Sequence, residues 1–115
     1  MSIIGDALDA YLDVLATAST LPVTRDPAEV IQGCIYIGSP TITGRTQGAF
    51  ILEVPVYLVA EGTGDSITNA WLLEQLPAFL TAGQMAQAEP RTLEVAGYTQ
   101  PTYQGTATIT VRSSN

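Results

Sequence analysis

The side chains able to do chemistry in this chain of 115 residues are carboxylates, five tyrosines and a single cysteine, because the sequence holds no histidine and no lysine. Cys34 lies in an apolar run, and a catalytic thiol needs a base, usually histidine, to activate it. We therefore predict that Cys34 is a buried thiol that packs as a small hydrophobic residue. The missing residue types also argue against an enzyme, so we expect no catalytic residue and no bound cofactor.

Two arrangements of carboxylates in the sequence could in principle bind a metal or catalyse a reaction. Asp6, Asp9 and Asp13 recur at helical spacing near the N-terminus, but a hard cation takes about six or more oxygen ligands held by a rigid loop. We predict that these aspartates form a solvated helix face and bind no metal. Glu53 and Glu94 are the acids within predicted strands, and paired carboxylates can hydrolyse glycosides. An unusual carboxylate enzyme is therefore kept as the least favoured alternative.

The charges of the chain are few and unbalanced. Eleven acids and four arginines give a net charge of −7. The arginines at positions 25, 45, 91 and 112 are scattered, whereas phosphate backbones are bound by clusters of basic residues. Nucleic acid is not expected as a tightly bound ligand. Charged residues make up only 13% of the chain, about half the usual share of ~25%, and charge depletion is typical of interface cores. We expect the chain to associate with itself.

Two segments show the periodicity of amphipathic helices. In residues 2–19, apolar residues recur every three or four positions opposite the aspartates. The second helix is predicted over 66–82 and ends at Gly83. Pro77 lies inside its pattern, which predicts either a kink or two short helices. We expect no membrane contact, because the N-terminus has no basic signal region and no apolar stretch could span a bilayer.

The remaining segments read as strands and turns. Residues 21–33 form a Pro-rich loop with a short extended piece at Val23–Arg25, and 34–43 form a strand that breaks near Gly38–Pro40. After a turn at 44–48, residues 49–60 alternate strongly, with the even-numbered ones on one face. Pro55 places this strand at an edge or at a bulge. The final strands are predicted over 91–112, with "TQPTYQG" either as their turn or within one long bent strand.

These segments predict one domain over residues 1–115 with the element order αββαββ. Short connections favour antiparallel pairing within each strand pair. We therefore expect an α+β fold of two layers, in which two helices pack on a mainly antiparallel sheet of about four strands.

The order of segments resembles the tail terminator, or tail completion, proteins of long-tailed bacteriophages, particularly those that infect actinobacteria. The resemblance is carried by the acidic N-terminal helix, the loop "DPAEVIQGCIYIGSP", the hairpin "TITGRTQGAFILEVPVYLVAEG", the second helix and the final strand "TATITV". In that family an N-terminal helix leads into a Pro-rich loop, then a strand, then a long strand ending in residues similar to "PVYLVA".

The resemblance implies a structural role without chemistry. It implies a homo-oligomeric ring, a hexamer, on the end of the polymerised tail tube protein, where the ring stops growth and meets a head-side connector protein. Genomic DNA would pass through without specific binding. The location implied is the virion, at the head–tail junction, after assembly in the host cytoplasm. An acidic channel would suit this role, because like charges repel DNA.

Two loops are candidates for contacts in such a ring. We expect residues 22–33, which include Asp26, and the 44–48 turn to project from the sheet. Arg25 and Arg45 are the only basic residues of the first ninety. They are predicted to pair with acids of an adjacent subunit or of the tube, such as those on the first helix, and such pairs set register and specificity. The candidate interface residues are Asp6, Asp9, Asp13, Arg25, Asp26 and Arg45.

Two further readings of the sequence stay open. The chain could be another head–tail connector or a tail tube component, in which case a tube subunit would polymerise into open filaments. It could also be a small-ligand-binding α+β domain with a pocket between helices and sheet. Ligand-dependent thermal stabilisation would indicate the second reading.

Overall fold

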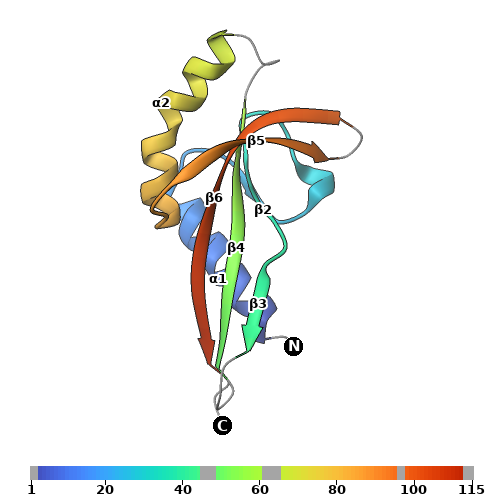
Figure 1. The fold of residues 1–115 in the computed structure, drawn as a ribbon, viewed down its shortest axis with the longest axis vertical. Helices are drawn as coiled ribbons and strands as arrows, with labels where there is room; N and C mark the ends of the chain where they lie inside the picture. Colours follow the sequence, from blue (N-terminus) through green and yellow to red (C-terminus); the bar gives the residue numbers. More distant parts are fainter. Residues whose placement is uncertain (1–2, 45–48, 61–65, 96–97, 113–115) are drawn as a thin grey trace.

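The computed structural model describes residues 3–44, 49–60, 66–95 and 98–112 (Figure 1). Within these residues the fold is α+β, with two helices and a curled mixed sheet of six strands. The elements are α1 (Ile3–Ala18), β1 (Val23–Thr24), the short 3-10 helix η1 (Pro27–Glu29), β2 (Ile35–Ile37), β3 (Thr41–Gly44), β4 (Ala49–Val59), α2 (Ser66–Gly83), β5 (Ala88–Val95) and β6 (Tyr98–Arg112).

The sheet has the strand order β1-β2-β4-β6-β5. β3 pairs with β4 on the same side as β2, further along β4. β1 runs parallel to β2, and every other pair is antiparallel. The longest ladder joins β4 to β6 and runs from Ala49↔Arg112 to Val59↔Thr102. Figure 1 shows β5 and the first part of β6 crossing over one end of β4, while the second half of β6 runs along it.

The expected four-strand, two-layer arrangement in the order αββαββ is not confirmed. The expected extended piece forms the short strand β1 at Val23–Thr24. The predicted strand over 34–43 divides into β2 and β3 at the expected break. The sheet also curls, so that Leu93 of β5 packs near Tyr57 of β4. Curling follows from the right-handed twist of a long two-stranded ladder, which a pattern of single segments does not reveal.

The main core lies between the two helices and one face of β4. Leu52, Val54, Val56 and Leu58 are fully buried, which confirms the predicted even-numbered face. They pack with buried residues of both helices, β2 and β6: Leu8, Leu15, Leu72, Phe79, Ile35, Ile37, Ala107 and Val111. Burial of each large aliphatic side chain contributes about 1.5–3 kcal/mol, so this face holds the helices on the sheet.

A smaller core lies on the opposite face of the sheet. Val30, Cys34 and Val59 are buried there, next to partly buried Tyr36 and Tyr57. Cys34 is free and 1% exposed, which confirms the predicted buried thiol. Burial raises the pKa of this thiol, so it stays protonated and poorly nucleophilic at neutral pH.

Pro55 lies inside β4, which is an internal strand and not an edge strand. Its carbonyl oxygen accepts a hydrogen bond of 2.8 Å from the Gly38 N–H. The N–H of a strand residue points to the same side as its C=O. The N–H that proline lacks would therefore have pointed at residues 38–40, where no regular ladder partner is required. The registers of β2 and β3 against β4 differ by one residue, which makes residues 38–40 a bulge. The bulge therefore belongs to the neighbouring strand.

α2 runs through Pro77 as a single helix, so the alternative of two short helices is wrong. The helix ends at Gly83, and the next residue, Gln84, has a φ of 56°. The Met85 N–H donates to the Leu80 carbonyl at 2.9 Å, and the Gln84 N–H donates to the Thr81 carbonyl at 3.2 Å. These two bonds form a Schellman cap and turn the chain towards β5.

Strand β5 begins three residues before the predicted start at 91, and β6 is one long strand. This confirms the reading of "TQPTYQG" as part of one long strand. Gly105 of β6 lies against Met85, because a Cβ built on this glycine would lie 2.6 Å from the Met85 sulfur. The close approach explains how the chain leaving α2 can fit against the middle of β6.

Candidate assembly surface

Among the described residues, two of the sheet edges that lack a partner strand lie on either side of β4. β3 pairs with β4 on one side only. β5 pairs with β6 only as far as Gly105, so residues 106–112 of β6 are paired with β4 alone. In the lower half of Figure 1, β3 and β6 flank β4. The same three-stranded part of the sheet therefore has an open edge on both sides.

The backbone groups at these edges point outward in a regular way. The Ala60 N–H donates to the Pro101 carbonyl at 3.0 Å, so odd-numbered residues of β6 point their backbone groups at β4. Because successive residues alternate, the N–H and C=O of Thr108 and Thr110 point away from it. On β3, by the same alternation, those of Ile42 point away from β4. Unpaired strand groups of this kind are a template for another strand.

Other edges of this sheet carry the usual protection against pairing. The outer edge of β5 holds Pro90 and the charged residues Glu89, Arg91 and Glu94, and β1 is only two residues long. Proline, charge and short length all hinder strand addition. Residues 106–111 of β6 contain neither charge nor proline, and β3 contains no charge. Among the residues that the structure describes, β3 and residues 106–111 of β6 are therefore edges without charge or proline on either side of β4.

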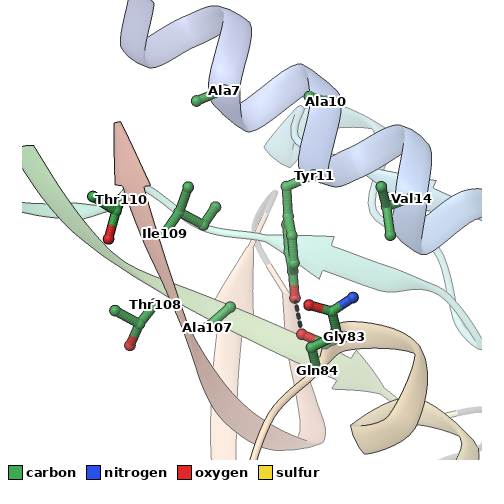
Figure 2. A pocket seen from close by; sticks show the side chains of 10 residues that line it. All are labelled: Ala7, Ala10, Tyr11, Val14, Gly83, Gln84, Ala107, Thr108, Ile109 and Thr110. Atoms are coloured by element: carbon green, nitrogen blue, oxygen red, sulfur yellow. Dashed lines mark hydrogen bonds between the residues drawn. The ribbon is translucent and has the colours of Figure 1, made fainter. Parts of the chain in front are cut away.

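A groove runs beside the open edge of β6 (Figure 2). Its volume is about 430 Å³, and it lies between α1, the end of α2 and β6. The lining residues are Ala7, Ala10, Tyr11, Val14, Gly83, Gln84, Ala107, Thr108, Ile109 and Thr110. None of them is charged, and most of the lining is methyl and aromatic surface. The groove offers hydroxyl groups and apolar contact but no acid or base for a reaction.

Tyr11 closes the inner end of this groove. Its hydroxyl donates a hydrogen bond of 2.8 Å to the Gly83 carbonyl oxygen, and Figure 2 shows the ring reaching from α1 to the end of α2. Burial raises the pKa of Tyr11 to about 12. The phenol is therefore neutral at neutral pH and acts as a structural donor.

The candidate ion pair of Arg25 forms within the chain. Its guanidinium contacts the carboxylate of Asp9, which links the end of β1 to α1. The Arg25 side chain is 34% exposed and that of Asp9 is 67% exposed. The predicted partner, an acid of the first helix, is thus present on the same subunit. An exposed pair of this kind contributes about 0–1 kcal/mol.

The other candidate residues are spread over the surface. The Asp26 carboxylate accepts a hydrogen bond of 2.9 Å from the Ala28 N–H and caps η1, so it has a local structural role. Asp6 and Asp13 are exposed on α1, as the solvated face predicts. Arg45 lies outside the described residues. Among the described residues, no group of three or more cysteine, aspartate or glutamate side chains could hold a metal ion.

The sequence reading missed the residues that line the groove and the open edges. Ile42 is 47% exposed and Val14 is 48% exposed, although both fit the apolar patterns of buried elements. The signal for β6 was present in the charge-free alternation "TATITV". The part of the β6 edge that stays open depends on where β5 stops pairing with β6. A local sequence pattern does not show this end point.

A second hollow lies on the opposite face. Tyr36 and Tyr57 stack there with ring centroids 5.7 Å apart, beside Pro27, Pro55 and Glu94. The pKa of Tyr36 is raised by burial, and the nearby Tyr57 and Asp26 add to this effect.

No model of a known protein family matches this chain, and no curated protein matches it at a significant level. The described helices include none that is long and apolar enough to cross a membrane. A functional proposal therefore rests on the fold, the surface and the sequence resemblance alone.

Proposed function

We propose that this chain is a structural subunit that closes into a ring with copies of itself, in the role of a bacteriophage tail terminator. One observation carries the proposal: among the described residues, β3 and residues 106–111 of β6 are open edges without charge on opposite sides of β4. Two different surfaces of one subunit can meet head to tail, and such contacts close into a ring when the rotation between subunits allows it.

The surface chemistry supports an assembly role over a catalytic one. The groove beside β6 is lined without any charged residue, and the chain has neither histidine nor lysine. Low charge suits surfaces that are buried between subunits. In this role the ring, a hexamer by the resemblance, ends the polymerisation of the tail tube protein and meets the head-side connector at the head–tail junction of the virion.

The net charge of −7 agrees with a conduit for DNA that does not bind it. The exposed acids of α1 and the scattering of the four arginines along the sequence disfavour attraction to phosphate. Genomic DNA would then pass the ring without being held.

The proposal is tested by the state of the purified protein and by its effect on tubes. Native mass spectrometry is expected to give one closed oligomer, and electron microscopy is expected to show rings. Added to polymerising tail tube protein, the ring should shorten the tubes and appear at one end only. Open filaments would indicate a tube subunit, and a monomer without effect on tubes would overturn the proposal.

The groove also favours a second candidate, a small-ligand-binding domain. A volume of about 430 Å³ lies within the range of small-molecule sites. This function predicts a monomer whose melting temperature rises in the presence of an apolar ligand. A thermal-shift screen on the monomeric fraction tests it.

A further inference from the structure

We propose that adjacent subunits join through β3 of one copy and the second half of β6 of the next, with Ile42 of the first copy seated in the groove beside β6. This inference rests on the proposed function, because it specifies the contact from which the ring is built. Its occupant is a second copy of this chain.

The register of the sheet places the matching surfaces on the same face. Ile42 lies opposite Leu52, and Leu52 lies opposite Ile109. Residues directly opposite each other in an antiparallel ladder point to the same face. Leu52 is buried under the helices, so Ile42 and Ile109 both lie on the helix-bearing side.

A neighbour that extends the sheet brings Ile42 to the groove. Head-to-tail addition keeps the helix-bearing face of both copies on the same side. The incoming Ile42 therefore arrives beside Ile109 and below α1, where Ala10 and Val14 line the groove (Figure 2). Ile42 and Val14 are among the most exposed large hydrophobic residues of the described chain, and this contact would cover both.

The direction of the strands fixes the kind of pairing. β3 and β6 are both antiparallel to β4, so they run parallel to each other within a subunit. A rotation about an axis along the strands preserves this direction, and the intersubunit pair is then parallel. The outward backbone groups of Ile42 would meet those of Thr108 and Thr110. A two-fold dimer through two β6 edges would instead be antiparallel and would leave Ile42 exposed.

The chemistry of both edges favours a second copy as the occupant. β3 and residues 106–111 of β6 contain no charged residue, whereas the exposed edge of β5 carries charge and proline. A subunit with a net charge of −7 repels its own copies over most of its surface. Contact between copies is therefore favoured where charges are absent.

A charge substitution at Ile42 tests the contact. Ile42→Lys places an ammonium in the uncharged groove and is expected to raise the dissociation constant of the oligomer about tenfold or more, since buried interface anchors are worth over ~1.4 kcal/mol. Leu73→Lys is the matched control, because Leu73 is 51% exposed on α2. Both variants lower the net negative charge by the same amount. Repulsion between subunits therefore does not explain a difference between their dissociation constants. Sedimentation velocity measures the oligomer, and circular dichroism confirms folding.

Cross-linking tests the pairing without relying on loss of assembly. Chains carrying Ile42→Cys or Val14→Cys are treated briefly with a short bismaleimide, and the wild type, whose Cys34 is buried, is the blank. Only the mixture is expected to give linked pairs. A link between two Ile42→Cys chains would show a two-fold contact and overturn the inference.

The outcomes separate this inference from the proposed function. Rings that cap tubes, persist in Ile42→Lys and give no link in the mixture would overturn this contact and leave the function standing. A wild-type protein that stays monomeric at high concentration and ignores tubes would overturn both.

Discussion

The Tyr11 hydroxyl donates a hydrogen bond of 2.8 Å to the Gly83 carbonyl oxygen and so ties the middle of α1 to the last residue of α2. The two residues are 72 positions apart in the chain. The carbonyl is one of the last four of its helix, which have no partner within the helix. This contact fixes the inner wall of the groove beside β6.

Removal of this hydrogen bond is expected to cost stability without changing the fold. Tyr11→Phe leaves the Gly83 carbonyl without its partner at a part-buried site and should lower the free energy of unfolding by about 1 kcal/mol. Urea denaturation measures the change. An unchanged midpoint would show that water replaces the hydroxyl at no cost.

The same residue predicts a loss of stability at high pH. Burial raises the pKa of Tyr11 from 10.0 to about 12, so the folded state holds its proton more tightly than the unfolded state. The resulting stability is fully present below pH 10 and is lost as the pH rises through 12. Denaturation between pH 9 and about 12 should show a steeper fall for the wild type than for Tyr11→Phe. Parallel curves would contradict the prediction.

The cap of α2 predicts a stabilising substitution. Gln84 has a φ of 56°, a conformation that costs a non-glycine residue about 1 kcal/mol or more. Gln84→Gly removes this cost and should raise the free energy of unfolding by about 0.5–1 kcal/mol. Gln75→Gly, inside α2, is the control and should lower it by about 1 kcal/mol. Thermal and urea unfolding of both variants give the comparison, and equal signs would contradict the assignment of the cap.

The contact between Gly105 and Met85 predicts coupling between two positions. A Cβ at Gly105 would lie 2.6 Å from the Met85 sulfur and 3.2 Å from the Gln87 carbonyl oxygen. Gly105→Ala should therefore destabilise the fold by about 1–3 kcal/mol. In a Met85→Ala background the same change should cost less, because the first of these clashes is gone. A double-mutant cycle measures the coupling, and additive effects would show that the methionine simply moves aside.

The ion pair between Arg25 and Asp9 predicts a small and salt-dependent effect. Arg25→Gln should lower the free energy of unfolding by at most about 1 kcal/mol, because both side chains are partly exposed. The difference from the wild type should shrink in ~1 M salt, which screens charges beyond about 3 Å. A larger loss of oligomer than of stability would show that Arg25 also contacts a neighbouring subunit.

The sequence by itself determined the parts of this protein that depend on local pattern. The spacing of apolar residues in 3–18 and 66–83 produced two helices, and the alternation in 49–60 produced the buried face of β4. Buried Cys34 and the break near Gly38 followed from local composition. These features were predictable because burial and backbone preference act within a few residues of each other.

Only the tertiary structure decided how the strands meet. The sequence placed Pro55 at an edge strand or at a bulge. In the structure β4 is an internal strand, and the bulge lies between β2 and β3, in the segment beside Pro55. Arg25 pairs with Asp9 of its own subunit, and the open edge of β6 begins where β5 stops pairing at Gly105. Strand order, register and curl depend on contacts between residues far apart in the chain. No local pattern encodes which of several compatible strands will be the partner.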